Sequence, residues 1–450
     1  MKESKYNVWL EYDKKWYVFN GVSGALLGLS REEHLGFQAY IAGEEEVACS
    51  IDLLEKLAYG RVFIPDSANE VAFLEERYKA SRGETDNFTL TVVTSLGCNF
   101  DCPYCFEAKH ASIIDGEVER YILEILDDQL PQIQNFQVTW FGGEPLVGKK
   151  PLLRLSDAFI ERCAQSKVQY AANILTNGYL LDEKTCMELR DRRVTAAQIG
   201  LDGPPSIHNQ LRPLAGGQGS FWRIVENIHS AIKYMDVSIR MNIDKGNIRA
   251  AEELMQILAK ESLAGKVKLY PGQIIQPGDD GGSPLKPYAG SCFSKPDFAQ
   301  AELEFGLLAE RYGFSKPSLP KPAGAPCTAV RTNELVVGSA GELYKCWNSV
   351  GHKMEVVGHI RDYGNPNGRL QKWLKYDPFQ NSECQTCIAL PVCMGGCASH
   401  AMTPGQYENR CGTFRHTYRE TIQNFIDRRT NLGLSAIVPP QALVRLTETR

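Results

Sequence analysis

Composition and charge exclude several classes of protein for this chain of 450 residues. A formal net charge of −5 gives no global positive field to attract nucleic acid or anionic lipid, and an apolar fraction of 43% excludes a disordered chain. No stretch approaches the roughly 18 continuous apolar residues of a membrane span, and the N-terminus lacks the apolar core of a signal peptide. We therefore expect a cytoplasmic protein with no nucleic-acid or membrane partner.

Residues 1–85 are predicted to form a small unit with a hairpin and three helices. Two alternating apolar runs, "YNVWLEY" and "KWYVFN", are separated by the charged "DKK" and predict paired strands. Helical apolar spacing follows in "REEHLGFQAYIAG" and "SIDLLEKLAYG", and a Ser cap precedes a third helix in "SANEVAFLEERYKAS". A short sheet with three helices is typical of a winged-helix-like unit.

Strands and helices alternate over residues 88–275. The predicted strands are "FTLTVVTS", "FQVTWF", "YAANILT", "TAAQIGL", "VSIRMNI" and "VKLYPGQII". This alternation predicts an α/β fold with a parallel sheet and right-handed crossovers, curved into a partial (β/α)6 TIM-like barrel. Ligand chemistry is expected at the C-terminal ends of such strands.

The rest of the chain divides into three predicted segments. Residues 276–315 hold the Gly/Pro-rich "QPGDDGGSPLKPYAG" and a bridging helix, which together read as a linker. Residues 316–433 are rich in cysteine, with a hairpin at "ELVVGSAGELYKCW", and residues 434–450 form a tail.

Fourteen cysteines in a reducing compartment indicate metal-bound or catalytic sulfur, because structural disulfides are uncommon there. Cys163 and Cys186 stand alone in helical patterns and are expected to be ordinary buried side chains. The role of Cys292 stays open. Ten others fall in tight groups: Cys98, Cys102, Cys105, Cys327, Cys346, Cys384, Cys387, Cys393, Cys397 and Cys411.

The first group has an uneven C-x3-C-x2-C spacing, and Cys98 follows the first strand of the barrel closely. Three thiolates are one short of closing a tetrahedral zinc site and one short of saturating a four-iron cluster. The remaining iron of a cluster could accept a nitrogen and an oxygen atom from a chelating ligand. A zinc site that borrows a distant fourth ligand is the alternative.

Short polar motifs follow the next three strands. In "FGGEP", Gly142 and Gly143 lack a Cβ atom, so the backbone can approach a ligand, and Glu144 can accept hydrogen bonds from an ammonium group. "LTNG" ends the third strand with Asn177, and "GLDGP" ends the fourth with Asp202. Either of these two could be a simple turn.

The C-x3-C-x2-C motif at this point of a β/α repeat resembles the radical S-adenosylmethionine (SAM) superfamily. The resemblance implies a 4Fe-4S cluster on Cys98, Cys102 and Cys105 that binds SAM and cleaves it to a hydrogen-abstracting 5'-deoxyadenosyl radical. "FGGEP" resembles the family element that binds the SAM amino group. The SAM-pocket residues implied by the resemblance are Gly142, Gly143, Glu144, Asn177 and Asp202.

The cysteine-rich third of the chain reads C-x13-G-x4-C, then C-x2-C-x5-C-x3-C, then a last cysteine. Gly341 supplies a tight hairpin turn that would bring two thiolate-bearing strands onto one cluster. The pattern resembles the SPASM domain, a seven-cysteine module with two auxiliary 4Fe-4S clusters; zinc ribbons are the alternative. The implied ligands are Cys327, Cys346 and Cys397 for the first cluster, and Cys384, Cys387, Cys393 and Cys411 for the second.

Two departures from the family pattern matter for function. Relatives that oxidise sulfatase residues have a further cysteine at the position of Lys321, so the first auxiliary set is one ligand short here. Either Cys292 completes it, or an open iron binds a substrate thiolate. Those relatives also have a catalytic Asp immediately after the second SPASM cysteine, where this chain has Trp347 after Cys346, which disfavours a sulfatase-maturing function.

The N-terminal unit resembles the leader-recognition element of enzymes that modify ribosomally made peptides. It would hold a leader by strand addition at an exposed sheet edge; a structural cap on the barrel is the alternative. The sequence thus predicts a radical SAM maturase with three 4Fe-4S clusters, reduced by a flavodoxin or ferredoxin. We expect it to form an intramolecular thioether in a ribosomally synthesised precursor peptide; carbon–carbon or carbon–oxygen crosslinking and a non-catalytic zinc scaffold are the alternatives.

Overall fold

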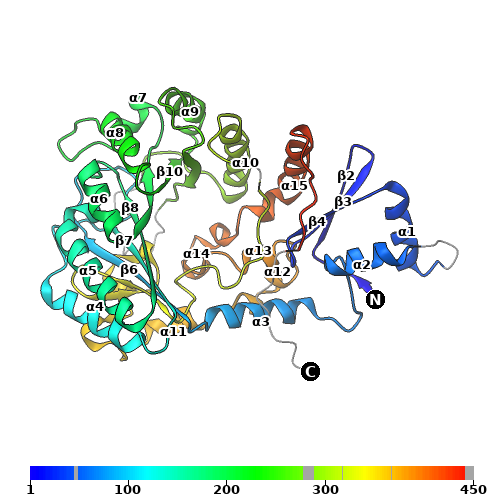
Figure 1. Ribbon diagram of the computed structural model, residues 1–450, viewed down its shortest axis with the longest axis horizontal. Helices are drawn as coiled ribbons and strands as arrows, with labels where there is room; N and C mark the ends of the chain where they lie inside the picture. The colour runs from blue at the N-terminus through cyan, green and yellow to red at the C-terminus, as the bar shows by residue number, and fades with distance from the viewer. Residues whose placement is uncertain (45–48, 277–287, 317, 366, 441–450) are drawn as a thin grey trace.

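The computed structural model describes residues 1–44, 49–276, 288–316, 318–365 and 367–440. The predicted Gly/Pro-rich break and the predicted C-terminal tail therefore lie partly outside the described residues. Figure 1 shows the barrel at one end of the molecule and the N-terminal unit at the other, with the cysteine-rich region between them.

Six parallel strands form the partial barrel that the alternation predicts. Their order in the sheet follows the chain, and each neighbouring pair is parallel. The strands are β6 (Asn87–Ser95), β7 (Asn135–Gly142), β8 (Gln169–Thr176), β9 (Val194–Gly200), β10 (Asp236–Ile243) and β11 (Val267–Gln273). This α/β fold is the one expected, with every strand end directed to one rim.

Amphipathic helices connect these strands. Helix α4 begins where the Asp115 side chain accepts a hydrogen bond from the Val118 amide, and it buries Val118, Ile122 and Ile125 in the core beside the sheet. The short helix α7 was not predicted from the sequence. The connecting helices are α4 (Gly116–Gln129), α5 (Lys149–Ser166), α6 (Glu183–Asp191), α7 (Pro205–Leu211), α8 (Phe221–Ala231) and α9 (Ala251–Lys260).

The cysteine-rich region continues the barrel sheet. Strand β12 (Glu334–Val337) pairs in parallel with β6, and Leu335 lies opposite Leu90. Strand β13 (Glu342–Tyr344) returns antiparallel to β12, after a turn in which Gly341 has a φ of 91°, and β14 (Gly358–His359) pairs with β13. One nine-stranded sheet therefore joins the two regions within the described residues.

Helices complete the cysteine-rich region and link it to its neighbours. The cysteine-bearing loops run between short helices, and the long helix α10 packs on β11 and on α15. These helices are α10 (Lys295–Arg311), α11 (Arg369–Leu374), α12 (Ser382–Gln385), α13 (Leu390–Cys393), α14 (Ala398–Met402) and α15 (Phe414–Asn431).

The N-terminal unit contains a three-stranded antiparallel sheet in the order β2-β3-β4, one strand more than the predicted hairpin. The added strand β4 is a short apolar run, "ALLGL", that lacks alternating polar residues. Three helices accompany the sheet, as predicted. The elements are β1 (Lys2–Glu3), β2 (Asn7–Tyr12), β3 (Lys15–Asn20), β4 (Ala25–Leu29), α1 (Arg31–Ala42), α2 (Ile51–Tyr59), β5 (Phe63–Ile64) and α3 (Glu70–Arg82).

Both faces of this small sheet are covered. Successive strand residues point to opposite faces, so Val18 packs with the helices of the unit while Phe19 packs with Ile422 and Ile426 of α15. The C-terminal segment reaches the outer edge of β4, where Leu26 and Val438 exchange two backbone hydrogen bonds of 2.9 Å. The unit is therefore fixed to the cysteine-rich region, and α3 leads from it towards the barrel (Figure 1).

Candidate active site

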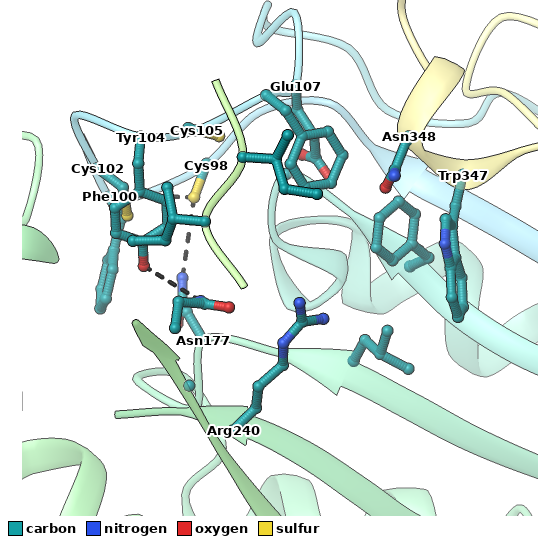
Figure 2. Close-up of a pocket in the computed structure, with 18 of the residues that line it drawn as sticks. Cys98, Phe100, Cys102, Tyr104, Cys105, Glu107, Asn177, Arg240, Trp347 and Asn348 are labelled. Carbon is teal, nitrogen blue, oxygen red and sulfur yellow. Dashed lines mark hydrogen bonds between the residues drawn. The ribbon is translucent and has the colours of Figure 1, made fainter. Parts of the chain in front are cut away.

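A cavity of about 380 Å³ opens at the C-terminal ends of the parallel strands. Figure 2 shows the three cysteines of the first motif on one side, Trp347 and Asn348 on the other, and Arg240 pointing into the space between. Polar groups from four different strands reach it. From the strand ends it is lined by Gly142, Thr176, Gln198, Arg240, Asn242 and Gln273.

Residues 96–109, here called the cysteine loop, carry all three thiols to this cavity. The loop is tied to the segment after α7, because Ala215 donates to the Asn99 carbonyl at 2.9 Å and Asp101 donates to the Pro213 carbonyl at 3.0 Å. The Lys109 ammonium group closes the loop by donating to the Phe100 carbonyl at 2.9 Å. The loop is thus a fixed frame for its thiols.

The three thiols of the cysteine loop are free and suited to a metal cluster. Cys98, Cys102 and Cys105 all line the cavity, and none is in a disulfide. Burial raises the pKa of each thiol, that of Cys102 to about 12, although the nearby charges of Lys109 and Arg212 oppose the rise. Metal coordination removes a thiol proton outright. Three neighbouring sulfur donors on one wall therefore fit the three cysteine-bound irons of a 4Fe-4S cluster.

In the described part of the chain, no three Cys, His, Asp or Glu side chains are grouped as a single metal ion would require. The cysteines of a four-iron cluster bind separate irons and stand further apart than the ligands of one ion.

Gly142 and Gly143 bring the end of β7 against the cysteine loop. Gly142 has a φ of 142°, which side chains rarely adopt. A Cβ atom on Gly143 would lie 2.7 Å from the Leu96 carbonyl oxygen and 2.9 Å from that of Gly97. The Gly143 amide also donates to the Ser95 carbonyl at 3.0 Å. Both glycines line the cavity, and their small size is required by the loop backbone itself.

Glu144 lies under the cavity and is fully buried. Its carboxylate accepts hydrogen bonds from the Leu146 amide at 3.0 Å, the Thr176 hydroxyl at 2.7 Å and the Asn177 amide at 2.7 Å. It joins the ends of β7 and β8. Its expected bond to an ammonium group stays a prediction.

Asn177 lines the cavity, and its backbone amide is held by Glu144. Its side-chain amide donates to the Asn99 side chain at 2.7 Å and to the Cys98 sulfur at 3.9 Å (Figure 2). It therefore links the end of β8 to the cysteine loop.

Asp202 is also buried and anchors the cysteine loop from the side of β9. It accepts a hydrogen bond from the Tyr104 hydroxyl and one of 2.9 Å from the Asn242 amide, and it pairs with the Arg212 guanidinium at 3.6 Å. Burial raises the pKa of Asp202, and Arg212 and these hydrogen bonds oppose the rise. The sequence analysis missed Tyr104, whose position between two of the motif cysteines was the available signal.

The structure brings together the four cysteines that the resemblance implies for the second auxiliary set. Its four thiols line one small cavity together with Arg410 and Arg415. The Arg415 guanidinium donates to the Cys411 sulfur at 3.1 Å, which places a positive charge beside the thiols. The four residues are Cys384, Cys387, Cys393 and Cys411.

The thiols of the first auxiliary set, Cys327, Cys346 and Cys397, interact electrostatically with one another. Ser399 forms a hydrogen bond with Cys346, and His400 forms one with Cys397. Burial raises the pKa of Cys397, but the His400 ring and nearby backbone amides favour its thiolate, so the net direction is downward.

Ser399 and His400 also line the main cavity, so the first auxiliary set lies directly behind its wall.

The isolated cysteines occupy other places. Cys163 and Cys186 are buried in the core, as predicted. Cys292 is half-buried, and its thiol lies beside Asp244 and the Gln276 backbone. Among the described residues, no electrostatic interaction joins Cys292 to the thiols of the first auxiliary set.

Comparison with known proteins gives a family for the barrel. Residues 92–258 match the Radical SAM superfamily. The serine-type anaerobic sulfatase-maturating enzyme of Klebsiella pneumoniae is 22% identical over 342 residues, covering 72% of this chain and 85% of that protein. The cysteine-type enzyme of Clostridium perfringens (strain 13 / Type A) is 21% identical over 361 residues, covering 75% and 96%.

Solved structures share the fold beyond the barrel. Native anSMEcpe with bound AdoMet and Kp18Cys peptide superimposes with a TM-score of 0.57 at 17% identity, covering 76% of this chain and 99% of that one. Streptococcus suis SuiB bound to precursor peptide SuiA gives a TM-score of 0.50 at 14% identity, covering 92% and 99%. No described helix is long and apolar enough to cross a membrane. With a matching barrel and a cysteine loop on its rim, the chain is an enzyme that contains a Radical SAM domain, and it shares its fold with the solved anSMEcpe and SuiB structures.

Proposed function

We propose that this enzyme matures a ribosomally synthesised precursor peptide by joining a cysteine sulfur to a carbon atom within the peptide. The observation that carries the proposal is the cavity itself, which has the cysteine loop on one side and, on the other, residues that neighbour the first auxiliary set: Trp347, Asn348, Ser399 and His400. A peptide held there would lie between both groups of thiols. The peptides named in the anSMEcpe and SuiB structures support a peptide as the substrate class.

When bound, SAM and three 4Fe-4S clusters would supply the 5'-deoxyadenosyl radical and take up the surplus electron, with a flavodoxin or ferredoxin as the donor. The residues of the chain hold and shield these groups. Cys98, Cys102 and Cys105 would hold the first cluster. The ring centroids of Phe141 and Trp347 lie 6.0 Å apart, and the two side chains form an apolar part of the cavity wall that would exclude water.

Arg240 is the residue of the cavity best suited to an anionic group. Its side chain points into the space in Figure 2, and its buried Nε has no hydrogen-bond partner among the described residues. A guanidinium binds carboxylates in a fixed geometry. We propose that it orients a carboxylate of the peptide or of SAM.

The bond changes of the proposed reaction balance as follows. A substrate C–H bond breaks and its hydrogen atom goes to the deoxyadenosyl radical, giving deoxyadenosine. The peptide thiol loses its proton, the C–S bond forms, and one electron leaves. The peptide therefore becomes lighter by two hydrogens and loses one free thiol.

Mass spectrometry with a thiol-blocking reagent tests this reaction. The precursor peptide, encoded by a short reading frame beside the gene, is incubated with reconstituted enzyme, SAM and a strong reductant. We expect a product two hydrogens lighter that takes up one blocking group fewer, and no product from Cys98→Ala. The same mass loss with all thiols still reactive would exclude the thioether and favour carbon–carbon or carbon–oxygen crosslinking.

A sulfatase-maturing function is the second candidate, favoured by the names of the sequence relatives. Trp347 stands immediately after Cys346 and offers no carboxylate at that position. An aldehyde formed from a serine or cysteine of a sulfatase peptide, detected with a hydrazine, would establish this alternative.

We further propose that the N-terminal unit holds the peptide leader by strand addition at β4. The C-terminal segment supports this choice of edge, because the backbone of Val438 already pairs there with Leu26. The other edge, β2, is approached by α15, and Arg419 donates to the Trp9 carbonyl at 3.4 Å. A leader bound at β4 would replace Val438 as the hydrogen-bond partner of the Leu26 backbone amide and carbonyl.

A further inference from the structure

The first auxiliary set has three thiols for a cluster of four irons, so one further ligand is open. Of the two alternatives named from the sequence, Cys292 does not fill it, because its thiol lies beside Asp244, and a substrate thiolate could fill it only when a peptide is bound. Lys321, which stands where relatives have a further cysteine, is exposed. The remaining candidates are the side chains that contact these thiols.

Histidine is a residue type that can bind metals, and His400 lies next to this set. Cys397 directly precedes helix α14, and His400 follows it by three positions, so both side chains lie on the same face of the first turn. The His400 ring forms a hydrogen bond with the Cys397 thiol and lines the main cavity. In the same turn, Ser399 forms a hydrogen bond with Cys346. This turn therefore faces two of the three thiols.

The orientation of the His400 ring leaves its second nitrogen, Nε2, in a position to bind a metal. Its Nδ1 lies 3.2 Å from the Asn409 carbonyl oxygen. A carbonyl can only accept, so Nδ1 donates there, and Nε2 is the nitrogen left to face the Cys397 sulfur or a metal. Metal-binding histidines show this arrangement, with one ring N–H held by a backbone carbonyl and the other nitrogen on the metal.

We infer that His400 is the fourth ligand of the first auxiliary cluster in the protein without substrate. The inference rests on the proposed function, because it requires that this cluster is present. A neutral imidazole in place of a thiolate makes the cluster less negative and raises its reduction potential, as histidine does in other iron–sulfur sites. Thiolate is the softer ligand, so a substrate cysteine entering from the cavity would displace the ring.

Pulsed electron paramagnetic resonance on reduced clusters tests this ligand. The full-length chain carrying Cys98→Ala, Cys102→Ala and Cys105→Ala retains only the auxiliary sites, and the second of these has four cysteines. We expect a strong coupling to nitrogen that changes when the protein contains ¹⁵N-labelled histidine. His400→Ala and His400→Cys should both abolish this coupling, while His400→Cys should keep the iron content of the parent because a thiolate fills the position.

His229→Ala is the matched control, because His229 lies on α8 and pairs with Glu261 at 3.4 Å, outside both auxiliary sets. It should keep the nitrogen coupling. Reduced auxiliary clusters without histidine coupling in the parent, or a coupling that survives His400→Cys, would overturn the assignment of His400 alone. Absence of any iron–sulfur cluster from the triple variant would overturn the three-cluster proposal together with it. If His400→Ala does not fold, His400→Cys still decides the question.

Discussion

Single residues at the rim of the barrel serve first to position the cysteine loop. Gly143, Asn177 and Asp202 were singled out as residues for binding SAM, and the structure shows what else they do. Each one fixes a different part of the loop that carries the three thiols. Their direct contact with SAM remains a prediction, whereas their effect on the loop can be tested on the protein alone.

Gly143→Ala should disturb the cysteine loop. The new Cβ atom would lie 2.7 Å from the Leu96 carbonyl oxygen, and overpacking of this kind costs roughly 1–3 kcal/mol. We expect lower iron loading of the radical SAM site, measured after anaerobic reconstitution of a chain whose auxiliary cysteines are unchanged. Gly116→Ala is the control, because its Cβ atom would meet nothing within 4 Å. Equal iron content in both variants would contradict the packing argument.

His208 should make the protein sensitive to acid. It is fully buried, its Nδ1 accepts the Asp202 amide at 3.1 Å, and burial together with Arg212 holds its pKa well below 6.5. The folded state therefore keeps the ring neutral while the unfolded state binds a proton below about pH 6.5, the ordinary histidine pKa. Stability from this group is present above that pH and is lost as the pH falls.

Anaerobic urea titrations at several pH values measure the effect. We expect the fall in unfolding free energy below about pH 6.5 to be shallower in His208→Asn than in the parent, because asparagine carries no titrating group. His359→Asn changes a half-buried histidine in β14 and serves as the control. An identical pH slope in all three proteins would contradict this role of His208.

At the scale of elements, the pairing of the C-terminal segment with β4 is the contact most open to displacement. One residue pair, Leu26 with Val438, carries the bridge. A protein that ends at Leu434 should show faster hydrogen exchange at the Leu26 amide, since that amide donates to the Val438 carbonyl. Exchange at Val18, in the middle strand of the sheet, should not change. Unchanged protection of Leu26 would mean that the segment does not cover this edge in solution.

The sequence predicted regular elements well and short apolar ones poorly. The six barrel strands are long and are separated by amphipathic helices, so their pattern is clear. Strand β4 was missed because both of its faces are buried, one against α2 and the other against α15, which removes the polar alternation. Helix α7 was missed because it has only seven residues, about two turns, and begins directly at Pro205.

At the scale of the whole molecule, the resemblance implied which cysteines belong together but not where the groups lie relative to one another. The spacing of Cys384 and Cys387 points to one loop, and the structure places both in one small cavity. The main cavity at the ends of the barrel strands depends on contacts between distant parts of the chain, such as that of Phe141 with Trp347. Local patterns contain no information on such contacts. The role proposed for His400 was not predicted from the sequence, and its position three residues after Cys397 was the available signal.

The parallel pairing of β6 with β12 has a mechanical consequence. The cysteine loop follows β6, and Cys346 follows the hairpin that β12 begins, so two cysteine-bearing regions start from adjacent strands of one sheet. The backbone hydrogen bonds between β6 and β12 hold the two strands at a fixed separation, so the distance between the two regions is fixed as well. Electron tunnelling between them would then occur over a constant gap, whatever peptide occupies the space above.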